Sequence, residues 1–402
     1  MKGTEARNLK PEAPHMTPRL VLAVLLSGLA LGCAHAPGRA APGEPEAALD
    51  SSPPPAVPPP ATAPPPLPIV FAAAGDIMLG TTFPEESNGA LLPPDDGREL
   101  LAQVTPILSA ADVAFGNLEG PLLDGGPSEK CRNARPGRCY AFRVPTRYGR
   151  HLQGAGFDVL SLANNHVGDF GDLGRESTRA ALDGLGIRYS GALGEVARLE
   201  VRGARIALVA FSVSAGTNDL NEVEAAARLV RDLSSDADLV VVSFHGGGEG
   251  ADRQHVPAGP EEFYGELRGD LRRFAHAVVD AGADLVLGHG PHVVRGMEVY
   301  RGRLVAYSLG NFATYRGFNL AGPNGLTLVL EARLARDGAF LGGRIHPARQ
   351  EPPGGPRLDP TGAVIPTVRQ LSREDFGAGA VVIGDDGALS PPAGGEPVAR
   401  CP

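Results

Sequence analysis

Basic residues are outnumbered by acidic ones in this sequence. Its 402 residues include 37 Lys and Arg against 46 Asp and Glu, which gives a formal net charge of −9 at pH 7, and no long basic run occurs. Nucleic-acid binding normally needs a cationic face, so we do not expect a nucleic-acid partner. An acidic protein can still bind an anionic substrate where local metal ions reverse the field.

An apolar run long enough to cross a bilayer is also missing. The charge-free stretch from Leu20 to Leu31 has 12 residues, whereas a spanning helix needs about 20. With Arg19 before it, this stretch suits the core of an export signal. It ends in LALGC, which resembles a bacterial lipoprotein signal with Cys33 as the lipidated residue. Ordinary signal cleavage near residues 34–36 is the alternative.

Bulky side chains are nearly absent between residues 34 and 68, which contain 13 prolines and no aromatic residue. Such a segment cannot bury a core and is typical of an extended, disordered tether. The sequence therefore divides into a signal peptide (1–33), a Pro-rich linker (34–68), a globular domain (69–350) and a C-terminal extension (351–402). Within the extension we expect weak strands at Val364–Val368 and Ala380–Ile383, and then a disordered tail.

Cysteine is scarce, with four residues in the whole chain. Cys131 and Cys139 bracket a short polar loop without an apolar pattern of its own. In an oxidising compartment this spacing suggests a small loop-closing disulfide. Two free thiols are the alternative.

Short apolar runs recur from Ile69 onward, and most are separated by amphipathic segments. Strands that alternate with helices predict a largely parallel α/β sheet. After Gly296 the sequence is rich in strands, which we expect to be antiparallel and to complete a second sheet. Helical spacing is clearest at Leu267, Leu271, Phe274, Val278 and Ala281.

Polar side chains follow the apolar runs where each run ends. The carboxyl ends of parallel strands meet at one edge of a sheet, so these side chains should share one crevice. The clusters contain Asp76, then Asn117 and Glu119, then Asn164, Asn165, His166 and Asp169, then His245 and Glu249, and finally His289 and His292.

This set of carboxylate, amide and imidazole groups lacks a thiolate and suits Mn, Fe or Zn. Two such ions close together would hold a phosphoryl or similar tetrahedral centre and activate a water. Each residue alone has a structural alternative: Asp76 as a helix N-cap, Asn165 as a turn residue, His245 as an interior histidine. Five clusters in one register favour a metal site over coincidence.

The same clusters resemble, in order, motifs of the CapA family of capsule-synthesis proteins, a branch of the calcineurin-like metallophosphoesterases. The matching segments, from about residue 69 to residue 315, are GDIML, NLEGPL, SLANNHVGDFG, the His-Gly-rich segment at His245, and GADLVLGHGPHVVRGMEVYRGRLVAYSLGNF. The resemblance implies a metallophosphoesterase-like two-sheet sandwich flanked by helices and a metal centre of one or two ions. It also implies a role in making capsule polymer, such as poly-γ-glutamate.

The resemblance also assigns roles to individual residues. The implied metal ligands are Asp76, Asn165, His245, His289 and His292, with Asn117 or Glu119 in the bridging position. His166 matches an acid or phosphate-contacting imidazole. Glu249 and Asn311 fall in motifs implied to contact substrate.

Three features depart from the family patterns. Met78 stands where phosphoesterases usually place a histidine ligand, and one extra residue separates His289 from His292. Gly246 and Gly250 stand where CapA relatives commonly have aromatic residues. These departures weaken the case for ordinary phosphatase chemistry and indicate an altered substrate surface.

We therefore expect an exported, membrane-anchored lipoprotein at the periplasmic or outer cell surface. It would act in the synthesis, transfer or anchoring of an anionic extracellular polymer. Its partners would be that polymer or its precursor, a membrane synthase complex, and the membrane itself through the lipid anchor. The alternatives are a metal-dependent cell-surface phosphoesterase and a non-catalytic polymer-binding assembly protein.

Overall fold

The computed structural model describes residues 67–134 and 139–393. The signal peptide, Cys33 and nearly all of the predicted tether lie outside these residues. Within the described ranges, no helix has both the length and the apolar character needed to cross a membrane.

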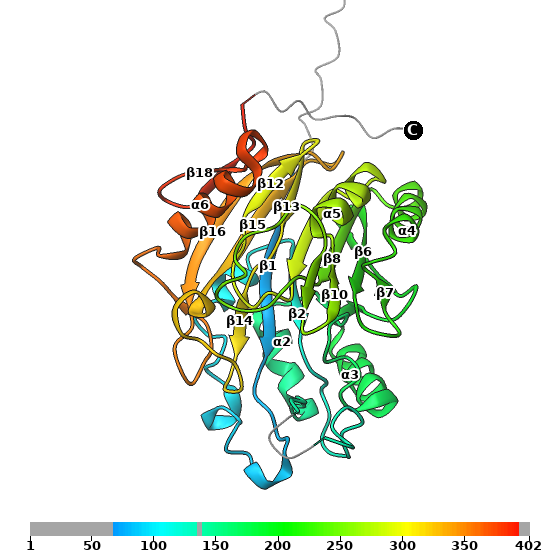
Figure 1. Ribbon diagram of the computed structural model, residues 1–402, viewed down its shortest axis with the longest axis vertical. Helices are drawn as coiled ribbons and strands as arrows, with labels where there is room; N and C mark the ends of the chain where they lie inside the picture. The colour runs from blue at the N-terminus through cyan, green and yellow to red at the C-terminus, as the bar shows by residue number, and fades with distance from the viewer. Residues whose placement is uncertain (1–66, 135–138, 394–402) are drawn as a thin grey trace, which may run out of the picture. The chain divides into compact units, whose positions relative to one another are not determined.

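Two sheets packed face to face form the framework of residues 67–393 (Figure 1). In spatial order the first sheet contains β18 (Val382–Ile383), β19 (Ala388–Ser390), β16 (Phe340–Arg349), β15 (Leu326–Leu334), β1 (Ile69–Met78), β2 (Val113–Leu118), β3 (Val159–Ser161) and β4 (Arg188–Ser190), with β14 (Asn311–Thr314) beside β1 and β17 (Arg357–Leu358) beside β16. The second contains β12 (Met297–Tyr300), β13 (Arg303–Ala306), β11 (Leu285–His289), β8 (Leu239–His245), β6 (Ala204–Ser212) and β5 (Val196–Val201), with β7 (Asn218–Asp219) beside β6. A separate hairpin consists of β9 (Glu261–Phe263) and β10 (Glu266–Gly269).

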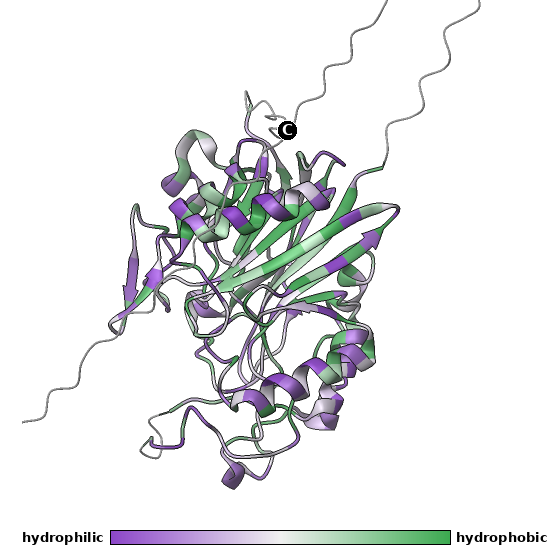
Figure 2. Ribbon diagram, turned by 90° about the vertical axis from the view of Figure 1, so that its right-hand side faces the viewer, coloured by the Kyte–Doolittle hydropathy of each residue, from purple (hydrophilic) through white to green (hydrophobic). Residues whose placement is uncertain are grey.

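Helices cover the outer faces of both sheets, so the predicted α/β two-sheet sandwich flanked by helices is confirmed. In Figure 2 the strands are coloured mainly as hydrophobic, whereas the helices mix hydrophilic and hydrophobic residues. The helices are α1 (Thr105–Leu108), α2 (Gly149–Ala155), α3 (Gly171–Leu185), α4 (Val223–Asp236), α5 (Leu271–Asp280) and α6 (Val364–Phe376).

Strand β1 shows how the sequence produces these layers. Phe71 and Ala73 belong to the core between the sheets, whereas Ala72 and Ala74 belong to the core beneath α2 and α3. Successive side chains of a strand point to opposite faces. Because both faces of β1 are buried, the strand is a nearly continuous apolar run instead of an alternating one. Burial of each large apolar side chain contributes about 1.5–3 kcal/mol.

The strand-rich part after Gly296 does not form one antiparallel sheet, contrary to our expectation. β12 and β13 extend the second sheet, and β13 pairs in parallel with β11. β15 and β16 are antiparallel and extend the first sheet beside β1. The apolar pattern marks where strands lie, but it does not say which sheet takes each strand.

Two local predictions were also wrong. The strand expected at Val364–Val368 is the first part of α6, where Val364, Val368 and Leu371 are buried at helical spacing. Pro366 is tolerated because the first turn of a helix leaves its N–H groups unpaired. The helix expected from Leu267 begins instead at Leu271, and Leu267 lies half-exposed on β10.

Candidate metal centre

The polar residues at the strand ends come from both sheets and meet at one edge of the sandwich. Within the first sheet, Asp76 on β1 is in register with Asn117 on β2. Within the second sheet, His245 on β8 is in register with His289 on β11. The two sheets meet where Nδ1 of His289 lies 3.2 Å from Oδ1 of Asp76.

A glycine allows Asp76 to reach this edge. The register of β1 against β2 shifts between Ala73 and Asp76. A Cβ at Gly75 would lie 2.0 Å from the carbonyl oxygen of Gly310, so no larger residue fits there. The close approach brings β14 alongside the end of β1 and fixes the backbone that carries Asp76.

Asp76 is fully buried and is bonded to three neighbours. Asn117 Nδ2 donates to its Oδ1 at 2.9 Å, and Nδ1 of His292 lies 3.1 Å from its Oδ2. Burial raises the pKa of this carboxyl, but the hydrogen bonds from His289 and His292 outweigh that effect and hold the pKa well below its usual value. Asp76 is therefore ionised and can act as a ligand.

Glu119 is buried with no hydrogen-bond partner at either carboxylate oxygen. Nε2 of His245 and Nε2 of His292 each lie 3.8 Å from its Oε1. Burial raises the pKa of Glu119 to about 8, with His292 opposing the shift and Asp76 adding to it. Buried carboxyl oxygens almost always have partners, so the two oxygens of Glu119 need either a bound cation or a proton.

His245 and His289 each leave a buried Nε2 without a partner. Burial lowers the pKa of His245 well below its usual value, so its imidazole is neutral, which is the form that binds metals. Nε2 of His245 lies 3.8 Å from Oε1 of Glu119, so these two residues bring unpartnered ligand atoms close together.

Three of these residues lie close enough together to be considered as ligands of one divalent cation. One ligand atom from each of Asp76, Glu119 and His292 lies within 4.8 Å of the others.

His292 is held in an unusual backbone conformation. Its φ is 57°, in the left-handed region that costs a non-glycine residue energy. Its carbonyl oxygen accepts hydrogen bonds from Asn311 Nδ2 at 3.1 Å and Asn324 Nδ2 at 3.4 Å. Asn311, predicted to contact substrate, thus fixes a ligand candidate, and its own Oδ1 is buried without a partner.

Every predicted ligand except Asn165 contacts another member of this group. Asn164, which we did not select as a ligand, donates from Nδ2 to Asn117 Oδ1 at 3.2 Å and to the carbonyl of Leu118 at 2.8 Å. The Oδ1 of Asn165 is buried without a hydrogen-bond partner, and the residue lines a neighbouring cavity. The Asn-Asn-His sequence signals both residues equally, so sequence could not separate their roles.

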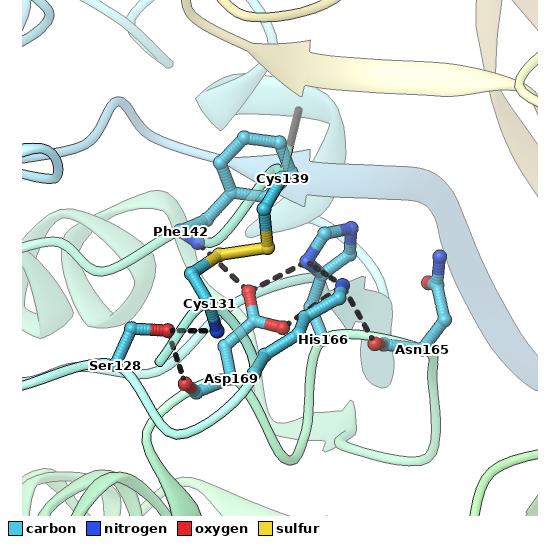
Figure 3. The surroundings of a disulfide bond; sticks show 8 residues. Ser128, Cys131, Cys139, Phe142, Asn165, His166 and Asp169 are labelled. Carbon is cyan, nitrogen blue, oxygen red and sulfur yellow. Dashed lines mark hydrogen bonds and ion pairs between the residues drawn. A yellow bond between two sulfur atoms is a disulfide. The ribbon is translucent and has the colours of Figure 1, made fainter. Parts of the chain in front are cut away.

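His166 is paired with Asp169 (Figure 3). Its Nδ1 lies 2.7 Å from Asp169 Oδ2, an arrangement in which Nδ1–H donates to the carboxylate. Burial lowers the pKa of His166, and Asp169 opposes the shift. Nε2 is then the nitrogen that can exchange a proton with a substrate. Asp169 was not among the predicted site residues.

Glu249, the other predicted substrate contact, lies next to His292. Its Oε2 is 3.9 Å from Nε2 of His292, and its Oε1 accepts from Nη2 of the buried Arg268 at 3.0 Å. The hairpin formed by β9 and β10 supplies Arg268. The charge of Glu249 is thus partly balanced by Arg268, and the Glu249 side chain is about a quarter exposed at the edge of the cluster.

A cavity of about 520 Å³ opens on the other side of the same loops. Asn165 and Leu118 line it, and Leu118 lies between Asn117 and Glu119 in the chain. Arg175 and Arg179 of α3 also line it. The cavity therefore pairs apolar surface with two cations next to the cluster.

The family model described as "Bacterial capsule synthesis protein PGA_cap" matches residues 70–316. Among curated proteins, "Capsule biosynthesis protein CapA" of Bacillus anthracis is 29% identical over 271 residues, which cover 62% of this chain and 61% of the relative. "PGA biosynthesis protein CapA" of Bacillus subtilis is 28% identical over 263 residues, covering 61% and 63%. A "probable polyglutamine synthesis accessory protein" of Mycobacterium tuberculosis is 29% identical over 262 residues, covering 56% and 62%. The chain spans less than two thirds of the length of these relatives.

Solved structures of phosphoesterases have a distantly similar fold. A 5'-nucleotidase precursor from Thermus thermophilus has a TM-score of 0.39 at 14% identity and covers 70% of this chain and 54% of its own. The "calcineurin-like phosphoesterase YfkN from Bacillus subtilis" has a TM-score of 0.40 at 11% identity and covers 76% and 97%. Likeness at this level concerns the fold class alone.

Proposed function

We propose, because the chain belongs to the PGA_cap family of bacterial capsule synthesis proteins, that it acts in the synthesis, transfer or anchoring of an extracellular polyanion of the poly-γ-glutamate type. The observation that carries the proposal is the buried group of Asp76, Glu119 and His292 at the strand ends, in which both carboxylate oxygens of Glu119 lack a partner. The proposed partners are the polymer or its precursor and a membrane synthase complex.

We place the protein outside the cytoplasmic membrane, held there by a lipid at Cys33. The sequence signal supports this location. So does the bond between Cys131 and Cys139, because disulfides persist mainly in oxidising compartments.

The proposed cofactor is one or two ions of Mn, Fe or Zn. Asp76, Glu119, His245, His289 and His292 would hold it, while Asn117 orients Asp76. When bound, such an ion polarises a phosphoryl or carbonyl oxygen and activates a water. His166 would hold or deliver a proton at Nε2, because Asp169 occupies its Nδ1.

The cavity lined by Arg175 and Arg179 is the proposed place for the polymer next to the reacting group. Arg175 is paired with Asp172 and Arg179 with Glu195. Asp172 is largely exposed, so solvent screens that pair and the Arg175 guanidinium remains open to a carboxylate of the polymer. Binding of short γ-glutamate oligomers should weaken with salt, and further in the variant Arg175→Gln/Arg179→Gln.

A metal-dependent phosphoesterase is the second candidate, favoured by the His166–Asp169 pair next to the cluster. One experiment separates the two functions from a non-catalytic binding role. The purified protein is assayed for bound metal, for hydrolysis of bis(p-nitrophenyl) phosphate and for retention of poly-γ-glutamate. In the source bacterium, surface polymer is measured after deletion of the gene and after complementation with wild type or His289→Ala. Polymer production that is restored by metal-free protein would sink the proposed mechanism.

A further inference from the structure

We propose that the Cys131–Cys139 disulfide is a positioning element for His166, because it joins the two chain segments that hold the His166–Asp169 pair (Figure 3). The first segment, residues 128–131, ends at one sulfur. The second segment, residues 139–142, begins at the other. The catalytic meaning of His166 rests on the proposed function, whereas the contacts that position it do not.

Asp169 is the residue through which both segments act. It is fully buried, and its Oδ2 accepts from His166 Nδ1 at 2.7 Å and from the backbone N–H of Phe142 at 2.8 Å. Its Oδ1 lies 3.0 Å from Lys130 Nζ, and its carbonyl oxygen accepts from Ser128 Oγ at 2.8 Å. Apart from His166, this carboxylate contacts the Phe142 N–H and Lys130 Nζ, one group from each segment.

The segments also contact His166 and its neighbour directly. The ring of Phe142 lies 4.4 Å from the imidazole, centroid to centroid, at an angle of 35°. Lys130 Nζ lies 3.4 Å from His166 Nδ1 and donates to the carbonyl oxygen of Asn165 at 3.3 Å. The imidazole is therefore fixed by a hydrogen bond on one side and by an aromatic face on another.

Outside the contacts with Asp169 and His166, the two segments are held by the ring of Phe142 against Phe318, with centroids 5.3 Å apart, and by a small apolar cluster. Their described residues form no helix or strand, and the small apolar cluster beneath them contains Leu123, Ala141 and Phe170 with Phe83 and Cys131 at its edge. The Lys130 side chain is about a third exposed, so its ion pair with Asp169 competes with water. A covalent bond that closes a short loop restricts the conformations open to both segments at once. Removing it should release the pair without unfolding the sheets.

The test is an NMR measurement on the purified protein, which needs no substrate. In ¹⁵N-histidine-labelled protein, a Nδ1–H bonded to a buried carboxylate gives a far-downfield proton signal, and loss of that signal in His166→Gln identifies it. In Cys131→Ala/Cys139→Ala the signal should disappear or exchange with water at least about tenfold faster, because the pair opens locally. The double cysteine variant should bind as much metal as wild type, and it should still unfold on heating in a cooperative transition.

Variants of Lys130 separate positioning from a general loss of structure. Lys130→Met should also speed exchange, and Lys130→Arg should restore it. Arg344→Met removes an ion pair of the exposed surface, with Asp386, and should have no effect on the signal.

Two results would overturn the proposal: absence of the signal in wild type, or wild-type exchange in the double cysteine variant. If that variant does not fold, the exchange is compared in wild-type protein before and after reduction of the Cys131–Cys139 bond, and unchanged exchange after reduction would overturn the proposal as well. If the proposed function in polymer synthesis is wrong, these NMR signals are unaffected. The experiment therefore tests the role of the disulfide independently of the proposed function.

Discussion

The proposed function assigns ion binding and proton transfer to different residues around Asp76. His289→Ala removes a buried Nε2 that has no hydrogen-bond partner. We expect metal affinity to fall by at least about 100-fold, since even residues behind the ligands change affinity by 10–100-fold. Metal analysis of the purified variant checks this. His346→Ala, which removes an imidazole paired with Glu331 on the first sheet, is the matched control.

His166→Ala should behave differently from His289→Ala. The imidazole of His166 contacts Asp169 through Nδ1 and packs against Phe142, and neither residue is a predicted ligand. Bound metal should therefore be retained. Any hydrolysis of bis(p-nitrophenyl) phosphate should fall by about 10²–10⁴-fold, the range for loss of a general acid or base. Metal loss in His166→Ala would show that the residue is a ligand instead. Wild-type protein without turnover, with polymer retained by both variants, would favour the binding role.

A buried ion pair next to the site offers a test of stability. Arg295 is fully buried and donates from Nη1 and Nη2 to Glu261 at 2.7 and 2.8 Å. Glu261 in turn accepts from the backbone N–H of Gly248, in the loop that carries Glu249.

Removing one partner of this pair leaves the other charge buried alone. Glu261→Gln should therefore lower the free energy of unfolding by about 3–5 kcal/mol, measured by urea denaturation. Replacing both residues, in Arg295→Met/Glu261→Leu, should recover much of that loss. An effect of Glu261→Gln below about 1 kcal/mol would mean that water reaches the pair.

Secondary-structure elements were the most predictable level of the fold. Runs such as Leu239–Phe244 and Leu285–Leu287 are buried on both faces, so they are recognisable as strands without any tertiary information. Helix α6 was predicted as a strand because Val364–Val368 has only five residues. So short a run does not distinguish the helical period of 3.6 residues from the strand period of 2. The division of the late strands between two sheets depends on long-range pairing that no local pattern encodes.

Helix α6 gives an element-scale prediction. Leu371 lies on its buried face, whereas Gln370 is exposed. Leu371→Ala should lower the free energy of unfolding by about 2–5 kcal/mol, because it leaves a cavity against the sheets. Gln370→Ala should change it by less than about 0.5 kcal/mol. Equal, small effects would mean that residues after 350 do not stabilise the sandwich.

The site was predictable only where residues follow strands. Asp76, His245 and His289 end strands, and parallel strand ends share an edge. Lys130 and Asp169 lie in loops, and their contacts depend on how residues 128–131 and 139–142 lie against the loop that holds Asp169. No spacing in the sequence indicates this arrangement.

At the scale of the whole chain, the export signal can be tested apart from the fold. Cys33→Ser should release the protein from membranes into the soluble fraction, because the lipid would be attached at that sulfur alone. Circular dichroism should show an unchanged folded state. Protein that stays membrane-bound and uncleaved would indicate a retained signal segment instead of a lipid anchor.

The ligand candidates come from strands of both sheets, with Asp76 and His289 far apart in the chain. No single stretch of the unfolded polypeptide carries the complete set. An ion can therefore be captured tightly only after the sheets have packed, and loading follows folding in time. A chain translocated in the unfolded state would choose its metal from the pool on the far side of the membrane. Cells with the same cytoplasmic metal content but different external Mn, Fe or Zn should then yield differently metallated protein.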